Sequence, residues 1–131
     1  MPNYCSIERT FLLRGSQGYD RMDKEGVNAV VMERISFQKP DLHMHSVFSD
    51  GTDTPESLLQ NVRAAGLDLF ALTDHDTAEG CAAVRALLRP GDPAFIGGVE
   101  VSCRDGRGKY HVLGYGFDAD RPAIRETVAY A

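Results

Sequence analysis

The chain has 131 residues and a mass of 14.4 kDa, enough for one compact domain but too few for a closed eight-stranded α/β barrel, which takes about 250 residues. Hydrophobic residues make up 43% and charged residues 25%, which is typical of a soluble globular protein and excludes a fibrous or wholly disordered chain. The 19 acidic residues outnumber the 14 basic ones, and the pI is near 5.3. This balance excludes a basic surface for duplex nucleic acid and suits a cation site better.

The cysteines and the apolar segments indicate the compartment. Cys5, Cys81 and Cys103 are odd in number, lie far apart and form no C-x-x-C pair, so we expect free thiols in a reducing cytoplasm. No apolar run approaches the roughly 18 residues of a membrane-spanning helix, and the N-terminus lacks the pattern of a secretory signal. We therefore expect a cytoplasmic protein with no membrane partner.

The sequence divides near residue 39. Residues 1–38 show a weak periodicity that glycines interrupt, and we expect an N-terminal extension of unassigned role that is partly disordered. From Pro40 onward, short apolar segments alternate with helical ones, which is the pattern of β-α units with a largely parallel sheet. We therefore expect an α/β domain over residues 39–131.

The first β-α unit begins with a short strand predicted for residues 41–45. A helix follows, with Thr54 at its N-cap, Pro55 at its first position and Gly66 after its end. Residues 67–72 are nearly all apolar, which predicts a strand that is covered on both faces.

The second unit places its helix at residues 78–88, with Asp76 or Thr77 as the N-cap. The following segments are expected to form a third strand, a β-hairpin and a last helix, which begin in turn near residues 94, 99 and 122. The hairpin spans residues 99–115 and turns at residues 105–108.

All four histidines lie at or just beyond the end of a predicted strand. The carboxyl ends of the strands form the functional face of α/β barrels, because their loops bring side chains together. His43 and His45 alternate by two on the first strand, so both imidazoles project to one side and can bind the same cation. Asp50 follows in a glycine turn, where it is either a further ligand or an ordinary turn residue.

Three later segments supply further candidate ligands. His75 follows the second strand between two aspartates, and helix capping explains its neighbours but not the histidine itself. Glu100 follows Gly97-Gly98, where the backbone can pass close to a ligand, and a buried glutamate needs a partner such as a metal ion. His111 is either a ligand opposite Glu100 or a histidine that packs on a sheet face.

Three basic residues, Arg104, Arg107 and Lys109, cluster in the hairpin turn. Such a turn is either a solvated loop or a contact for a phosphate group. We retain the three residues as candidate substrate-binding residues. The sequence singles out no catalytic residue beyond the metal ligands.

Five short motifs follow one another between residues 41 and 118: Asp41-Leu42-His43-Met44-His45-Ser46, Ser49-Asp50-Gly51, Thr73-Asp74-His75-Asp76-Thr77, Gly98-Val99-Glu100 and His111-Val112-Leu113-Gly114-Tyr115. In order and separation they resemble the PHP (polymerase and histidinol phosphatase) family. The joint pattern is most similar to the branch of stand-alone phosphoesterases that act on nucleotides and short oligonucleotides.

The resemblance implies a distorted seven-stranded β/α barrel, of which this chain would supply the first three or so β/α units. It also implies up to three divalent metal ions, usually zinc, manganese or iron, which activate a water molecule for attack on a phosphate ester. Carried over by position, the six candidate ligands divide among the ions as follows: His43 and His45 on one ion, Glu100 bridging it to a second ion on His111, and Asp50 with His75 on a third.

The later ligands of the family, a further histidine and an Asp-x-His pair, have no counterpart in these 131 residues. We therefore expect a truncated PHP domain, whose open sheet is covered by a missing C-terminal half or by a second copy of the chain. The leading hypothesis is a metal-dependent phosphoesterase, a hydrolase of small phosphorylated substrates such as nucleotides. The alternatives are a non-catalytic or incomplete PHP module with a structural or partner-binding role, and an amidohydrolase-type metal hydrolase.

Overall fold

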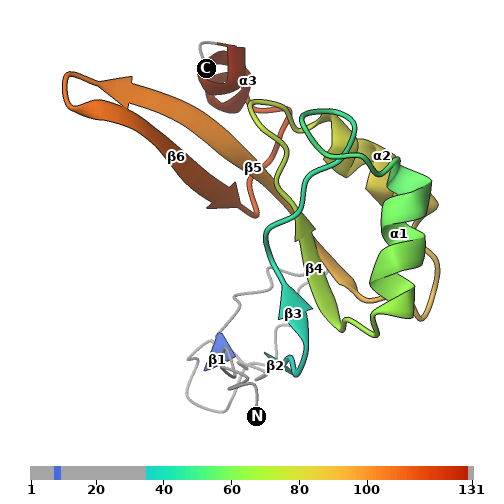
Figure 1. Cartoon of the computed structure of the whole chain (residues 1–131). Coiled ribbons are helices and arrows are strands. Elements are labelled where there is room, and N and C mark those ends of the chain that lie inside the picture. Colours follow the sequence, from blue (N-terminus) through green and yellow to red (C-terminus); the bar gives the residue numbers. More distant parts are fainter. Residues whose placement is uncertain (1–7, 10–34, 130–131) are drawn as a thin grey trace, which may run out of the picture. The chain divides into compact units, whose positions relative to one another are not determined.

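The structure is a computed structural model, which describes residues 8–9 and 35–129 (Figure 1). The chain divides into two compact units, Met1–Gln38 and Lys39–Ala131. Within the described part of the chain, no helix has the length and apolar content that crossing a membrane requires.

In the first unit, β1 (Glu8–Arg9) pairs with β2 (Ile35–Ser36) in antiparallel orientation. The sequence predicts that residues 1–38 form a partly disordered N-terminal extension. Apart from β1 and residues 35–38, this segment lies outside the described residues. Cys5 lies outside them too. The predicted character and role of this extension therefore stay predictions.

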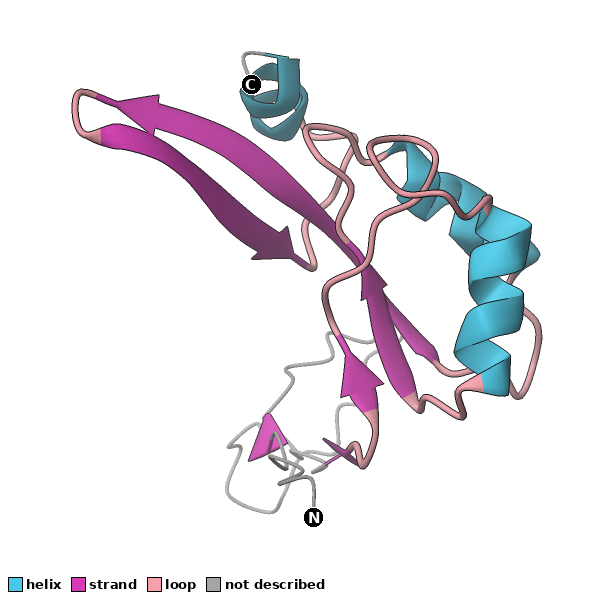
Figure 2. Cartoon of the chain, viewed as in Figure 1, coloured by secondary structure: helices cyan, strands magenta, loops and turns pink. Residues whose placement is uncertain are grey.

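The second unit is built around a four-stranded sheet in the order β3-β4-β5-β6 (Figure 2). The first three strands are parallel, and β6 returns antiparallel to β5. The strands are β3 (Pro40–Asp41), β4 (Leu69–Leu72), β5 (Ala94–Asp105) and β6 (Gly108–Tyr115). The helices are α1 (Pro55–Ala64), α2 (Glu79–Leu87) and α3 (Pro122–Ala129). The predicted α/β class, hairpin and last helix are confirmed.

Local sequence explains where α1 begins and ends. Thr54 Oγ1 accepts a hydrogen bond from the backbone N–H of Ser57 at 3.2 Å, and Pro55 occupies the first helical position. Gly66 follows the C-cap with a φ of 68°, a left-handed conformation that glycine adopts without strain. The predicted start and stop signals of this helix are confirmed.

The hydrophobic core lies between the first two helices and the parallel strands. Its buried members come from one face of α1, from α2 and from β4: Leu58, Leu59, Val62, Phe70, Leu72, Cys81 and Val84. All four residues of β4 are buried, as the sequence predicts. Burial of each large apolar side chain contributes roughly 1.5–3 kcal/mol, so the core anchors β4 and the polar segment that follows it. Cys81 and Cys103 are free thiols, as expected.

The first strand is shorter than the segment predicted at residues 41–45. It ends at Asp41, whose carboxylate accepts the backbone N–H of His43 at 3.2 Å and so removes that donor from strand pairing. The residues that follow stay close to the sheet, because the carbonyl of Met44 accepts the backbone N–H of Thr73 at 2.8 Å.

β5 is one continuous strand where the sequence predicts two segments. Packing requires Gly98, because a Cβ there would lie 2.8 Å from Cγ2 of Thr73 and 3.1 Å from the carbonyl oxygens of Leu72 and Gly114. A Cβ at Gly97 would lie 2.5 Å from Nη2 of Arg85, the end of a flexible side chain. The expectation that these glycines admit a ligand is therefore wrong, since other parts of the chain occupy the space beside them.

The expected capping of α2 by Asp76 is also wrong. The N-cap position is Ala78, and the hydroxyl of Thr77 accepts the backbone N–H of Glu79 at 3.2 Å. Asp76 has a left-handed φ of 56°, and its Oδ1 accepts the backbone N–H of Ser102 at 2.7 Å. Its carboxylate is thus engaged by β5 and is not available to the helix.

An ion pair joins α1 to the loop after α2. Nε and Nη2 of Arg63 donate to the two carboxylate oxygens of Asp92 at 2.7 and 2.8 Å, and the backbone N–H of Arg89 donates to the same group at 2.7 Å. The hydrogen bonds from Arg63, and then from Arg89, lower the pKa of Asp92 from the ordinary 3.8 to about 2.

This pKa predicts how stability changes in acid. Because the folded-state pKa of Asp92 lies below the unfolded-state value, its carboxylate stabilises the fold fully above pH 3.8 and loses this contribution as the pH falls through about 2. We expect Asp92→Asn to flatten the pH dependence of the free energy of unfolding over this range, measured by urea denaturation. Arg63→Gln should have a similar effect. An unchanged slope in Asp92→Asn would contradict the assignment.

Candidate metal centre

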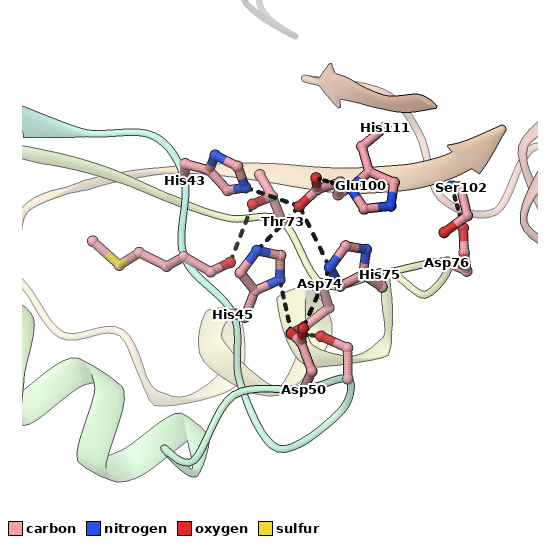
Figure 3. A network of polar contacts seen from close by, with 12 residues as sticks. His43, His45, Asp50, Thr73, Asp74, His75, Asp76, Glu100, Ser102 and His111 are labelled. Atoms are coloured by element: carbon pink, nitrogen blue, oxygen red, sulfur yellow. Dashed lines mark hydrogen bonds and ion pairs between the residues drawn. The ribbon is translucent and has the colours of Figure 1, made fainter. Parts of the chain in front are cut away.

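The four histidines and one buried carboxylate meet where the parallel strands end (Figure 3). The side chain of Glu100 is 6% exposed. Its Oε2 lies 2.8 Å from Nε2 of His43, 3.1 Å from Nε2 of His45 and 3.7 Å from Nε2 of His75. Its Oε1 lies 3.0 Å from Nδ1 of His111. One carboxylate is therefore in contact with all four imidazoles.

Asp50 completes the cluster on its solvent side. Its two carboxylate oxygens lie 3.5 Å from Nδ1 of His45 and 3.5 Å from Nε2 of His75. The Asp50 side chain is 68% exposed, in contrast to that of Glu100. The structure thus places all six candidate ligands in one cluster with a buried acidic side and an exposed acidic side.

His43 and His45 face Glu100 although both lie beyond the end of β3. Met44, between them, packs against the core. Its carbonyl accepts hydrogen bonds from the backbone N–H of Thr73 at 2.8 Å and from the Thr73 hydroxyl at 3.1 Å. Because successive side chains of an extended segment alternate in direction, the two imidazoles point away from the Met44 side chain. The predicted alternation holds here without a strand.

His75 and Glu100 are placed by a continuation of the pairing between β4 and β5. The two residues form a parallel bridge beyond the end of β4. The carbonyl of Asp74 accepts the Glu100 N–H at 3.0 Å, and the carbonyl of Glu100 accepts the Asp76 N–H at 3.0 Å. These bonds fix the two backbones against each other and so hold the two donor side chains together.

His111 reaches the cluster from β6. It pairs with Ser102 across the hairpin and is therefore a diagonal neighbour of Glu100 on the same sheet face. Its side chain is 54% exposed, which does not suit the alternative of a histidine packed on a sheet. The hydroxyl of Tyr115 donates to the carbonyl of Leu42 at 2.6 Å and ties β6 to the segment that carries the first two histidines.

Several polar residues that position the ligands are absent from the sequence-based site. Thr73, Asp74, Asp76 and Tyr115 each make a hydrogen bond that holds one ligand segment to another. Asp74 carried the clearest signal in the sequence, because it lies just beyond the fully apolar segment Leu69–Leu72. The structure shows that it is buried, with 1% of its surface exposed. A buried aspartate in such a place needs donors nearby.

The histidines keep the Glu100 carboxylate ionised. Burial raises the pKa of Glu100, but the hydrogen bond with His43 and the charges of His75, His43 and His45 together outweigh it, so the pKa is lowered from the ordinary 4.5. A carboxylate with this pKa is an anion at neutral pH and can act as a ligand.

The spacing of the donor atoms fits divalent metal ions. Two atoms that bind one zinc ion at about 2.0–2.1 Å lie roughly 3 Å apart, and the contacts of Glu100 with the imidazoles span 2.8–3.7 Å. Among the described residues, there are three donor groups in which one ligand atom from each residue lies within 4.8 Å of the others: His43, His45 and Glu100; His45, Asp50 and His75; and His75, Glu100 and His111.

A polar atom of His45 supports the same conclusion. Its buried Nδ1 has no hydrogen-bond partner in the described structure, and the Asp50 oxygen 3.5 Å away does not form a hydrogen bond with it. A cation between this nitrogen and the carboxylate would satisfy both groups. Because His45 and His75 each belong to two donor groups, the assignment of particular ions to particular residues stays a prediction.

The candidate substrate-binding residues lie outside this cluster. Arg104 and Lys109 are paired directly across the hairpin, and both are exposed. Side chains alternate along a strand, so Arg104 lies on the same face as Glu100, about 13 Å farther along β5. Arg107 lies in the turn between the two strands.

Two curated relatives match about two thirds of this chain. A phosphoribosyl 1,2-cyclic phosphate 1,2-diphosphodiesterase from Eggerthella lenta is 42% identical over 87 residues, which cover 64% of this chain and 33% of the relative. A 3',5'-nucleoside bisphosphate phosphatase from Chromobacterium violaceum is 46% identical over 85 residues, which cover 64% of this chain and 30% of the relative. The matched part is thus about a third of each relative.

A solved structure and the family profile also match this chain. An amidohydrolase from Chromobacterium violaceum, solved with bound sulfate and without metal, is similar with a TM-score of 0.65 and 41% identity over 70% of this chain and 32% of that chain. This coverage confirms the expected partial barrel. The PHP domain profile matches residues 41–119, a span that includes all six candidate ligands, and the chain therefore belongs to the PHP domain family.

Proposed function

We propose that this chain carries the first part of the active site of a metal-dependent phosphoesterase. The observation that carries the proposal is the buried Glu100 carboxylate in contact with four imidazoles, with the exposed carboxylate of Asp50 on the other side. The proposed metal ligands are His43, His45, Asp50, His75, Glu100 and His111.

The chemistry of the donors suits zinc, manganese or iron, because imidazole nitrogens and carboxylate oxygens are common ligands of these ions. Bound ions would act as Lewis acids on the phosphoryl oxygens and lower the pKa of a bound water. The protein holds the imidazoles at fixed directions through Thr73, Asp74 and the β4–β5 pairing. Glu100 closes the inner side of the site, and Asp50 leaves the outer side open to a substrate.

The proposed substrate is a small phosphate ester, such as a nucleotide or a short oligonucleotide. Support comes from the two curated relatives, whose names specify a cyclic phosphate and a nucleoside bisphosphate as substrates. A cytoplasmic location, and coverage of the open edge of β6 by a second copy or by further chain, stay predictions.

Two alternatives remain distinct from this proposal. The amidohydrolase from Chromobacterium violaceum favours hydrolysis of C–N bonds, and it predicts activity on cyclic amides. The second alternative is a PHP module that binds metal or a partner without catalysis, and it predicts full metal loading without turnover of either substrate class.

The first test measures metal binding. Glu100 belongs to two of the three donor groups, so Glu100→Gln should weaken binding of zinc or manganese by more than the 10–100-fold that is typical when a supporting residue is lost. Elemental analysis after loading and desalting, together with calorimetric titration, measures the effect. Glu126→Gln, on α3, is the matched control and should bind metal as the wild type does.

The second test measures hydrolysis. The metal-loaded chain should release phosphate from a nucleoside bisphosphate, and a chelator should abolish the release, because a metal-activated water is the proposed nucleophile. A cyclic amide is assayed in parallel. If a fully loaded chain hydrolyses no phosphoester, the catalytic proposal is lost and the non-catalytic alternative gains support.

The third test concerns the basic hairpin. Like charges directly opposite each other are unfavourable in a sheet. We therefore propose that the Arg104–Lys109 pair contacts a second phosphate group on the face that bears Glu100. Replacing both residues by Gln should weaken binding of a bisphosphate several-fold and leave binding of inorganic phosphate unchanged, as measured by calorimetry. Arg121→Gln is the control. Equal loss for both ligands would rule out a role specific to the second phosphate.

A further inference from the structure

Asp74 is buried beside the metal-ligand cluster without belonging to it. None of the donor groups found among the described residues includes this side chain. Its Oδ1 accepts hydrogen bonds from the backbone N–H of Ser46 at 2.6 Å and from the hydroxyl of Ser49 at 2.8 Å, and its Oδ2 accepts one from the hydroxyl of Ser46 at 2.7 Å. Asp74 therefore binds the loop that leads to Asp50.

The backbone of the same residue contacts two other ligand segments. Asp74 precedes His75 in the chain, and its carbonyl accepts the N–H of Glu100 at 3.0 Å. One residue thus connects the loop of Asp50, the segment of His75 and the strand of Glu100.

The position of Asp50 depends on this loop. Its carboxylate is 68% exposed and lies 3.5 Å from each of two histidines, so burial does not hold it in place. The loop closes through the carbonyl of Ser46, which accepts the N–H groups of Ser49 at 3.1 Å and of Gly51 at 2.9 Å. A Cβ at Gly51 would overlap the carbonyl of His45, so the loop is packed tightly against the segment that carries that ligand.

A carboxylate suits this role better than another side chain of similar size. It accepts several hydrogen bonds at once and donates none, which matches the three donors from the loop. The space is also closed on the helix side, since a Cβ at Gly80 would lie 2.6 Å from Oδ2 of Asp74.

We propose that Asp74 is a positioning residue that holds Ser46 and Ser49 so that Asp50 faces His45 and His75, and thereby forms that donor group. The proposal rests on the proposed metal-binding function. In this role Asp74 neither binds the ion nor contacts a substrate. The proposal predicts that His45, Asp50 and His75 no longer bind a cation together when the loop is released from Asp74.

The test compares metal binding by variants of the full chain. Asp74→Ala and Ser49→Ala should weaken the same binding step that Asp50→Asn weakens, by 10–100-fold for Asp74→Ala and by less for Ser49→Ala, in calorimetric titrations with manganese or zinc. Asp74→Asn keeps an acceptor for the loop and should restore part of the affinity. The control is Thr127→Ala, which removes a side-chain hydrogen bond of 2.8 Å to the carbonyl of Ala123 on α3, away from the loop, and should leave every step unchanged.

A second readout does not require metal. In the metal-free protein, hydrogen exchange of the Gly51 amide should be faster in Asp74→Ala and Ser49→Ala than in the wild type or in Thr127→Ala. If the wild type binds no cation, the proposed function fails, and the exchange rates still decide whether Asp74 holds the loop. If Asp74→Ala does not fold, Ser49→Ala decides both readouts. Wild-type binding and wild-type exchange in Ser49→Ala would overturn the proposal.

Discussion

The buried Glu100 carboxylate is the group on which the arrangement of the strand ends depends. A buried anion is costly unless charged or hydrogen-bonding groups surround it, and here four imidazoles do so within 2.8–3.7 Å. Each imidazole belongs to a segment that backbone hydrogen bonds hold in place. Examples are the bond that the Met44 carbonyl accepts from the Thr73 N–H and the bonds that pair β5 with β6. Glu100 is thus the common partner of four segments that other contacts hold in place.

The apolar core and the polar cluster depend on the same strand. β4 is buried along its whole length between α1, α2 and its neighbours. The next residues, Thr73 to Asp76, continue its direction out of the core and exchange hydrogen bonds with the segments on either side. Packing of apolar side chains therefore determines where the polar side chains emerge, which is why the cluster forms at this edge of the sheet.

Sequence patterns predicted the elements whose signals are local. The N-cap at Thr54, the apolar run of β4 and the hairpin turn are confirmed, because caps, burial patterns and turn residues act over a few positions. The candidate ligands were predicted from histidines and a glutamate near the ends of apolar segments and from an aspartate in a glycine turn, although Glu100 and His111 lie within β5 and β6 and not at their ends. The failures have two causes. β3 ends early because the Asp41 carboxylate binds the N–H of His43 two residues later, a local contact that the apolar pattern does not reveal. The other failures involve tertiary partners, since Asp76 binds β5 and the glycines of β5 lie against Arg85 and Thr73. The role of Asp74 was missed for the same reason.

The donor atoms come from four segments that are far apart in the chain, between His43 and His111. An unfolded chain cannot present them together, so any cation that prefers this constellation binds the native state selectively. Thermodynamic linkage then makes the ion a folding ligand, whose free concentration relative to its dissociation constant sets the extra stability, about 2.7 kcal/mol at a hundredfold excess. If the chain binds such a cation as proposed, chelation and denaturation are coupled equilibria.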